Sequence, residues 1–162
     1  MTVSLKLLSK DEKHILRNLY SLYLHDLSEF TDGLDISTSG SFEFDSFELI
    51  WERDGLTPYF LKKNQAIVGF LLLLERPFLK KGYDFSINDI FMLKKFRRKG
   101  IAISLLEELF KQKKGRYFVV ELAKNKPAVL FWRKIYRELD IDFEEEKKIV
   151  DNEECLVQSF QI

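Results

Sequence analysis

Several residue types on which specialised architectures depend are scarce in this sequence. Cys155 is the only cysteine, so the chain can form no internal disulfide, and a reducing, cytoplasmic setting is expected. With only two histidines beside that thiol, there are too few soft ligands for a zinc site, and we predict no metal. Glycine and proline are also rare. We find no linker, repeat or low-complexity tract and predict one domain over residues 1–162.

The sequence also lacks an excess of charge and a long apolar run. Basic and acidic residues number 26 each, so a nucleic acid is not expected as a partner. The longest apolar run, Ile67 to Leu74, is strand-sized and too short to cross a bilayer. The first six residues lack the basic-then-apolar plan of a signal peptide. We therefore expect no membrane partner.

Apolar residues make up 46% of the chain, which is enough for one hydrophobic core, and their spacing predicts alternating strands and helices. Ser9 and Glu12 have the spacing of a capping box, so a helix should begin near Lys10. Residues 31–46 are expected to form a loop. The other expected elements are, in order, strand 3–7, short helix 47–53, hairpin strands 58–62 and 66–75, strand 85–93, a helix from 101, strand 117–122, a helix from Pro127, and closing strands near 141–150 and 154–161. This order predicts the α/β class, with right-handed crossings in a mixed sheet.

The basic turn Lys94 to Ala102 lies between a predicted buried strand and an amphipathic helix. A helix N-terminus has unpaired N–H groups and a partial positive charge, which together can bind an anion. Gly100 has no Cβ, so a pyrophosphate can approach the backbone closely. The competing interpretation is a solvated basic turn that caps a core helix. The glycine patterns of nucleotide-hydrolysing and dinucleotide-binding loops are absent from the sequence.

Two motifs carry a family resemblance. Arg97-Arg98-Lys99-Gly100-Ile101-Ala102 fits the pattern Arg/Gln-x-x-Gly-x-Gly/Ala between a strand and a helix, and Asn125 to Trp132 fits a second motif behind it. With both motifs in register, the chain resembles the GCN5-related N-acetyltransferase (GNAT) family, in an uncharacterised bacterial branch. The resemblance implies a twisted, mostly antiparallel mixed sheet of about seven strands with flanking helices. It also allows a homodimer built on the last two strands.

In activity, the resemblance implies an enzyme that moves an acetyl group from acetyl-CoA, as co-substrate, to a primary amine of a small molecule or peptide. It implies that strand backbone pairs with the pantetheine arm, that the basic turn holds the pyrophosphate, and that the second motif flanks the thiol end. The cofactor-binding residues implied in this way are Phe91, Met92, Leu93, Arg97, Arg98, Lys99, Gly100, Ile101, Ala102, Asn125, Ala128, Phe131 and Trp132.

For catalysis, many family members use a carboxylate on the fourth strand as the base, and Asp89 is the candidate here. Its other interpretation is a strand-end residue paired with a lysine. Many relatives use a tyrosine as the acid where this sequence has Trp132, whose indole N–H is no useful acid. The acid is therefore unassigned, although a thiol with a pKa of roughly 8.5 can leave without one. His25 and Asp26 fall where the family binds acceptors.

Other residues are predicted to be structural. Cys155 is expected to be a small strand residue rather than a nucleophile. The acidic residues Asp142 and 144–146 are expected to form a solvated strand face. The Phe-rich segment 42–47 is expected to pack in the core or anchor a loop, with the lining of an acceptor cleft as the alternative. Two alternative functions stay open, a non-catalytic CoA-binding or regulatory module and a nucleic-acid-binding module that uses the basic turn.

Overall fold

The protein is built on one seven-stranded sheet with the strand order β1-β2-β3-β4-β5-β7-β6. The computed structural model describes residues 2–162, so Met1 of the N-terminal segment discussed above lies outside the described residues. The strands are β1 (Val3–Leu7), β2 (Leu56–Lys63), β3 (Ala66–Glu75), β4 (Phe85–Met92), β5 (Arg116–Leu122), β6 (Phe143–Val150) and β7 (Glu153–Gln161). Among the strands of the described residues, only β4 and β5 pair in parallel. The predicted mixed, mostly antiparallel sheet of about seven strands is confirmed.

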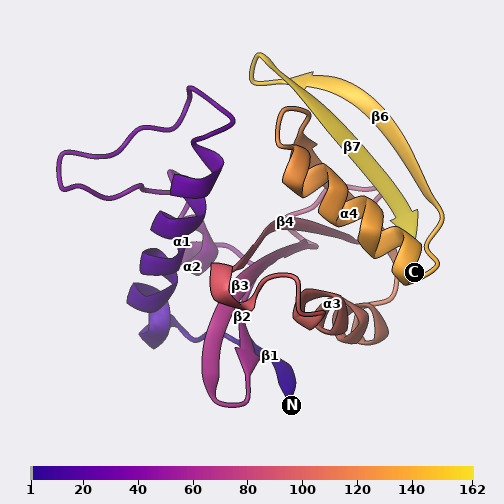
Figure 1. Cartoon of the computed structure of the whole chain (residues 1–162), viewed down its shortest axis with the longest axis horizontal. Coiled ribbons are helices and arrows are strands. Elements are labelled where there is room, and N and C mark those ends of the chain that lie inside the picture. Colours follow the sequence, from indigo (N-terminus) through magenta and orange to yellow (C-terminus); the bar gives the residue numbers. More distant parts are fainter. Residues whose placement is uncertain (1) are drawn as a thin grey trace.

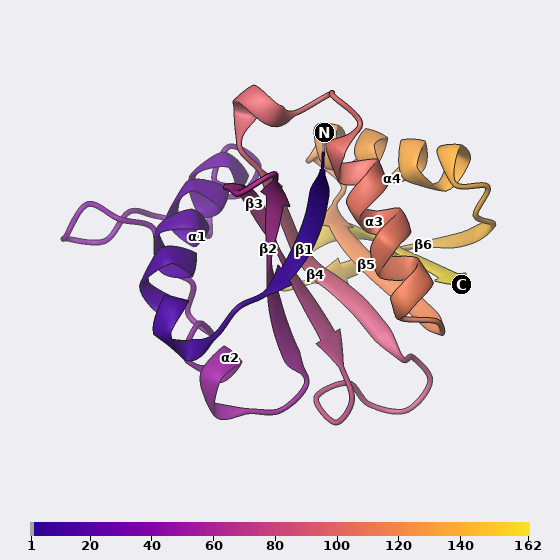
Figure 2. The same cartoon turned by 90° about the horizontal axis from the view of Figure 1, so that it is seen from below.

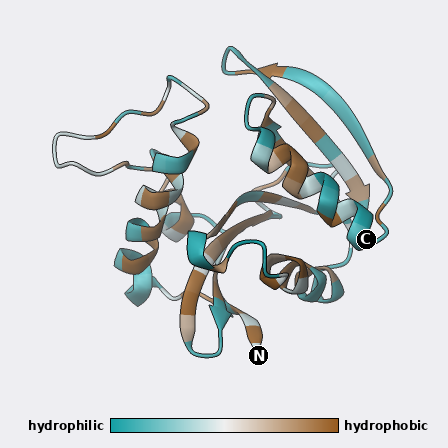
Figure 3. Cartoon of the chain, viewed as in Figure 1, coloured by the Kyte–Doolittle hydropathy of each residue, from teal (hydrophilic) through white to brown (hydrophobic). Residues whose placement is uncertain are grey.

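Helices cover both faces of this sheet. The helices are α1 (Lys13–Leu27), α2 (Leu49–Glu52), α3 (Ile101–Gln112) and α4 (Lys126–Glu138), with short 3-10 helices η1 (Lys10–Glu12) and η2 (Lys94–Phe96). Figures 1 and 2 show α1 and α2 on one side of the central strands and α3 and α4 on the other. Each longer helix carries both hydrophobic and hydrophilic residues (Figure 3), as expected for helices that pack on a sheet.

Two hydrophobic cores result, one on each face of the sheet. On the α1 face, Leu16 and Tyr20 pack against Phe60 and Phe70 of the central strands. On the α3 and α4 face, Leu105, Leu109 and Ile135 pack against β2, β3 and β5, again with little or no exposure. Within residues 2–162 no helix is long and apolar enough to cross a membrane.

The parallel contact between β4 and β5 is short. It joins Phe85 to Tyr117 and Ser86 to Phe118, and no later pair joins these two strands within the described chain. Both strands nevertheless continue, β4 to Met92 and β5 to Leu122. The sheet therefore splits at this point and leaves strand-edge N–H and C=O groups available to another chain-like molecule.

Two expectations need correction. The Ser9–Glu12 capping box is present, but the turn that it begins is the 3-10 helix η1, and the α-helix starts at Lys13. The four acidic residues around β6 are all exposed, as expected, but they do not share one face, because successive side chains of a strand point to opposite faces. Glu145 accepts a hydrogen bond from Gln158 at 2.8 Å and pairs with Arg133 of α4 at 3.1 Å.

Candidate active site

The basic turn between β4 and α3 has a backbone shape suited to a phosphate. After η2 the chain passes Arg98 and Gly100, with φ angles of 61° and 77°, before α3 begins. Gly100 is the N-cap residue of α3, and a Cβ there would meet no atom of the described chain within 4 Å. The first N–H groups of α3 have no intrahelical partners. Such groups are a common binding site for phosphates.

Arg97 holds the turn in place. Its Nε donates to the carbonyl oxygen of Met92 at 2.7 Å, and its guanidinium pairs with Asp26 of α1 at 2.7 Å. It also lies 5.5 Å from the ring centre of Phe91. The structure thus brings together four residues predicted for the site, although the Arg97 side chain is used to fix the turn. The neighbouring cations of Arg98 and Lys99 are exposed.

The second motif forms the start of α4. Asn125 caps this helix, because its Oδ1 accepts a hydrogen bond from the Ala128 N–H at 3.2 Å. Trp132 is buried in the core between α4 and the sheet, and the half-buried Phe131 meets it edge-on at 5.3 Å. Tyr136, one turn on, is also buried and donates to Gln158 at 2.8 Å. The position at which the family resemblance predicts a tyrosine therefore holds a large, buried indole ring.

Asp89 faces α1 because β4 contains a bulge. Leu72 of β3 pairs with Asp89 and Leu73 pairs with Ile87, so Asn88 is the extra residue. One carboxylate oxygen of Asp89 accepts hydrogen bonds from the Tyr20 hydroxyl at 2.7 Å and the Asn88 amide at 2.9 Å. Burial raises the pKa of Asp89, and hydrogen bonds from Tyr20, Asn88 and Tyr23 oppose that rise. Asp89 is therefore bonded to hydroxyl and amide groups rather than paired with a lysine.

A pocket of about 310 Å³ opens beside Asp89, between α1 and the loop that follows it. Aromatic rings of Tyr20, Tyr23 and Phe44 line it, and the Tyr20 and Phe44 rings stack 4.7 Å apart. The carboxylates of Glu43 and Asp45 belong to the same lining. The Phe-rich segment therefore both anchors the loop and lines a pocket.

The remaining candidates lie as follows. His25 is exposed on α1, with its ring 5.8 Å from that of Phe42. Cys155 is buried in β7, and burial raises the pKa of its thiol, which fits a structural residue. Glu121 of β5, which the sequence did not single out, is a buried carboxyl under α4. A charged residue inside the apolar stretch from Tyr117 to Leu122 is the signal that marks it.

Comparison with known proteins bears directly on this geometry. The model of the acetyltransferase (GNAT) family matches residues 17–136. The chain belongs to the GNAT family. No curated protein matches it. The family assignment confirms the resemblance carried by the two motifs.

Solved structures share the GNAT fold. An acetyltransferase from Thermus thermophilus matches with a TM-score of 0.70 and 14% identity, over 100% of this chain and 98% of that one. AAC(6′)-Ib, in complex with ribostamycin and coenzyme A, matches with a TM-score of 0.68 and 14% identity, over 99% of this chain and 94% of that one. Diaminobutyrate acetyltransferase EctA from Paenibacillus lautus, in complex with its substrate and coenzyme A, matches with a TM-score of 0.62 and 14% identity. This match covers 99% of this chain and 95% of that one. At these identities the likeness shows the fold.

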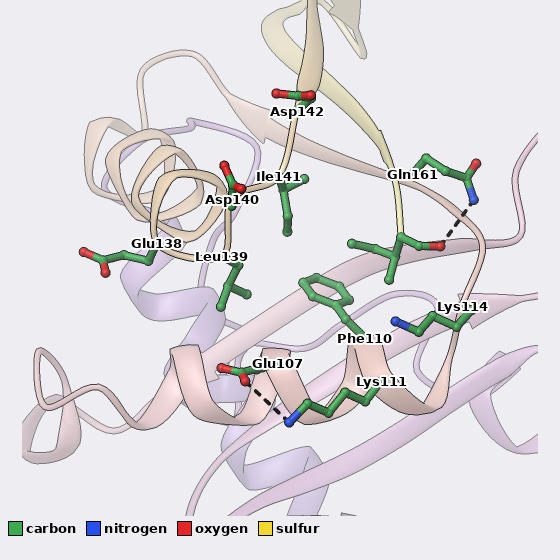
Figure 4. A pocket seen from close by; sticks show the side chains of 11 residues that line it. Glu107, Phe110, Lys111, Lys114, Glu138, Leu139, Asp140, Ile141, Asp142 and Gln161 are labelled. Carbon is green, nitrogen blue, oxygen red and sulfur yellow. Dashed lines mark hydrogen bonds and ion pairs between the residues drawn. The ribbon is translucent and has the colours of Figure 1, made fainter.

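Figure 4 shows a larger cavity of this GNAT chain, of about 750 Å³, and no residue of the basic turn belongs to its lining. It opens between the C-terminal parts of α3 and α4 and the start of β6. Apolar Phe110 and Leu139 lie in it beside the Glu107–Lys111 ion pair, while the cofactor motif is at the other end of α3. This cavity therefore does not belong to the candidate active site.

Proposed function

We propose that this GNAT-family chain transfers an acetyl group from acetyl-CoA to a primary amine of a small molecule or peptide. The split between β4 and β5 carries the proposal. The open N-terminus of α3 lies on one face of the sheet, and Asp89 with its pocket lies on the other. An acyl donor held on the first face can therefore meet an amine held on the second.

The residues present suit an acyl-CoA. The amides from Arg97 to Ala102 would bind the pyrophosphate, with the charges of Arg98 and Lys99 beside them. The free edge of β4, near residues 91–93, would pair with the amides of the pantetheine arm. Asn125, Ala128, Phe131 and Trp132 would flank the arm from the start of α4. Complexes of the relatives AAC(6′)-Ib and EctA with coenzyme A support this choice of donor.

Asp89 is the proposed base. The amine nitrogen attacks the thioester carbonyl and forms the C–N bond, its proton passes to Asp89, and the C–S bond breaks to release the thiolate. A carboxylate with a raised pKa is a better base near neutral pH than an ordinary aspartate. Unpaired N–H groups at the edge of β4 can stabilise the carbonyl oxygen as it gains negative charge.

The acceptor pocket suits a cationic amine. Aromatic faces attract ammonium groups, and the partly exposed rings of Tyr23 and Phe44 line the pocket. Glu43 and Asp45 add negative charge to the same lining. The solved relatives include one with the aminoglycoside ribostamycin and one with L-2,4-diaminobutyric acid, both of which carry amines. His25 and Asp26 lie near the end of α1, and we propose that they contact larger acceptors.

Binding and turnover are tested separately. Acetyl-CoA should raise the melting temperature, because a ligand that binds only the folded state stabilises it. Thiol release from acetyl-CoA is then measured over amino acids, polyamines, aminoglycosides and peptides. No melting shift at millimolar acetyl-CoA would refute the proposal at its first step.

Trp132 favours one alternative, a CoA-binding module without catalytic activity. The ring lacks the acidic hydroxyl that many relatives provide at this position. This alternative predicts a melting shift with acetyl-CoA but no thiol release with any amine class. Binding accompanied by amine-dependent release would exclude it.

A further inference from the structure

Glu121 is a buried carboxyl group that no other part of the described chain satisfies. Only 5% of the residue is exposed, and neither carboxyl oxygen has a hydrogen-bond partner among residues 2–162. An unpaired buried polar group destabilises a fold by roughly 1–3 kcal/mol, so apolar residues normally occupy such sites. The neighbouring inward-facing residues of β5, Tyr117 and Val119, follow that rule.

Glu121 lies beside the split in the sheet. The last pair that joins β4 and β5 is Ser86 with Phe118, so Glu121 lies three residues beyond it on β5. Asp89 lies three residues beyond it on β4. Strand alternation places Glu121 on the face of Tyr117 and Val119, which α4 covers, whereas Asp89 faces Tyr20 of α1. The two carboxyl groups therefore lie on opposite faces of the sheet beside the split, where we propose that the thioester lies.

The polar groups around Glu121 form hydrogen bonds and ion pairs with one another and none with Glu121. From α4, Arg133 pairs with Glu145 of β6 at 3.1 Å, and Tyr136 donates to Gln158 of β7 at 2.8 Å. Gln158 in turn donates to Glu145 at 2.8 Å. The buried thiol of Cys155, also on β7, completes the titratable groups near this side chain.

These surroundings keep Glu121 protonated at neutral pH. Burial raises the pKa of Glu121 to about 8; the negative charge of Glu145 adds to the rise, and Arg133 opposes it. A neutral carboxyl group carries one O–H donor, which an ionised carboxylate lacks. The site therefore contains a carboxylic acid that is protonated near neutral pH. It lies on the same face of the sheet as the basic turn.

We propose that Glu121 is the proton donor to the thiolate of coenzyme A in the transfer reaction. The inference rests on the proposed function. As the C–S bond breaks, its electron pair stays on sulfur, which takes the proton of Glu121 and leaves as the thiol. The amine proton goes to Asp89 and then to solvent, and the Glu121 carboxylate regains a proton from water that enters the split once the thiol has left. This assignment fills the role that Trp132 cannot perform.

The test compares wild type with Glu121→Gln, which keeps the shape and loses the acid. The control is Glu144→Gln, which changes an exposed residue on the face of β6 opposite to that of Glu145. Using acetyl-CoA and one active amine, both saturating, kcat is measured from pH 6 to pH 10. A general acid accelerates a reaction by about 100-fold or more, but by less when the leaving group is a thiolate. The kcat of Glu121→Gln should therefore fall about 10- to 100-fold.

The pH profile separates a proton donor from a structural residue. The wild type and the control should lose activity as pH rises through about 8, and Glu121→Gln should lack that alkaline limb. The acetyl-CoA melting shift should persist in all three proteins. An alkaline limb kept in Glu121→Gln, or an unchanged kcat, would overturn the role of Glu121 alone. No turnover in the wild type would overturn the proposed function, and the donor role with it.

Discussion

Asp89 of β4 and Glu121 of β5 each lie three residues beyond the last pair that joins their strands, on opposite faces of the sheet. Burial raises the pKa of both groups, but their partners differ. Asp89 accepts hydrogen bonds that favour its anion, whereas Glu121 has no hydrogen-bond partner within residues 2–162. Environments of this kind separate a base from an acid.

Replacing Asp89 with asparagine should remove the base. We expect a loss of about 100-fold or more in kcat/KM for the amine. The wild type should gain activity as pH rises through the elevated pKa of Asp89, because the base must be ionised. Asp89→Asn should lack this rise while keeping the acetyl-CoA melting shift. Unchanged activity in the variant would remove Asp89 from the mechanism.

The hydrogen bond from Tyr20 should set the pKa of this base. Tyr20→Phe keeps the ring that stacks on Phe44 and removes the hydroxyl that stabilises the Asp89 anion. The pKa of Asp89 should then rise further, and the acidic limb of the kcat/KM profile should move to higher pH. A limb that stays in place would show that Tyr20 does not tune the base.

The sequence predicted the elements well because their signals are local. Alternation gave most of the strands, and the capping box at Ser9 and the proline at position 127 marked where helical structure begins. The two cofactor motifs depend on local spacing too, and they led to the family that the comparison confirmed.

The contacts inside the site were not predictable in the same way. The ion pair between Arg97 and Asp26 joins residues 71 positions apart in the chain, and the bulge at Asn88 decides which face Asp89 takes. The sequence shows Glu121 as a charge in an apolar stretch, but only the fold shows that its carboxyl group is buried without a partner within residues 2–162. Pairing distant segments needs the fold, which no local pattern contains.

Two glycines provide a matched test of the phosphate turn. Gly100 and Gly40 have φ angles of 77° and 84°, and a Cβ would meet nothing of the described chain within 4 Å at either site. Alanine should destabilise the fold by about 1–2 kcal/mol in both places. Only Gly100→Ala should weaken acetyl-CoA binding, by about tenfold, measured by titration calorimetry. Equal affinities in the two variants would place the pyrophosphate elsewhere.

Stability should reveal the protonation of Glu121 without any turnover. Its pKa is about 8 in the folded protein against 4.5 ordinarily, so the native state binds more protons between these values. The contribution of Glu121 to stability is therefore complete below about pH 4.5 and lost as pH rises to about 8. Between these pH values, the free energy of unfolding of Glu121→Gln should rise relative to that of the wild type. The total rise should be a few kcal/mol, at about 1.4 kcal/mol per pKa unit. The free energy of unfolding is measured in urea at each pH. The same dependence on pH in the wild type and in Glu121→Gln would contradict this prediction.

Acetyl transfer itself is tested most directly by following both products in one reaction. Purified protein is incubated with acetyl-CoA and each amine class, while free thiol is measured by absorbance and acetylated amine by mass spectrometry. We expect equal amounts of thiol and acetylated amine for at least one amine class, with both products lost in Asp89→Asn. Acetyl-CoA binding without any acetylated amine would contradict it and leave a CoA-binding module.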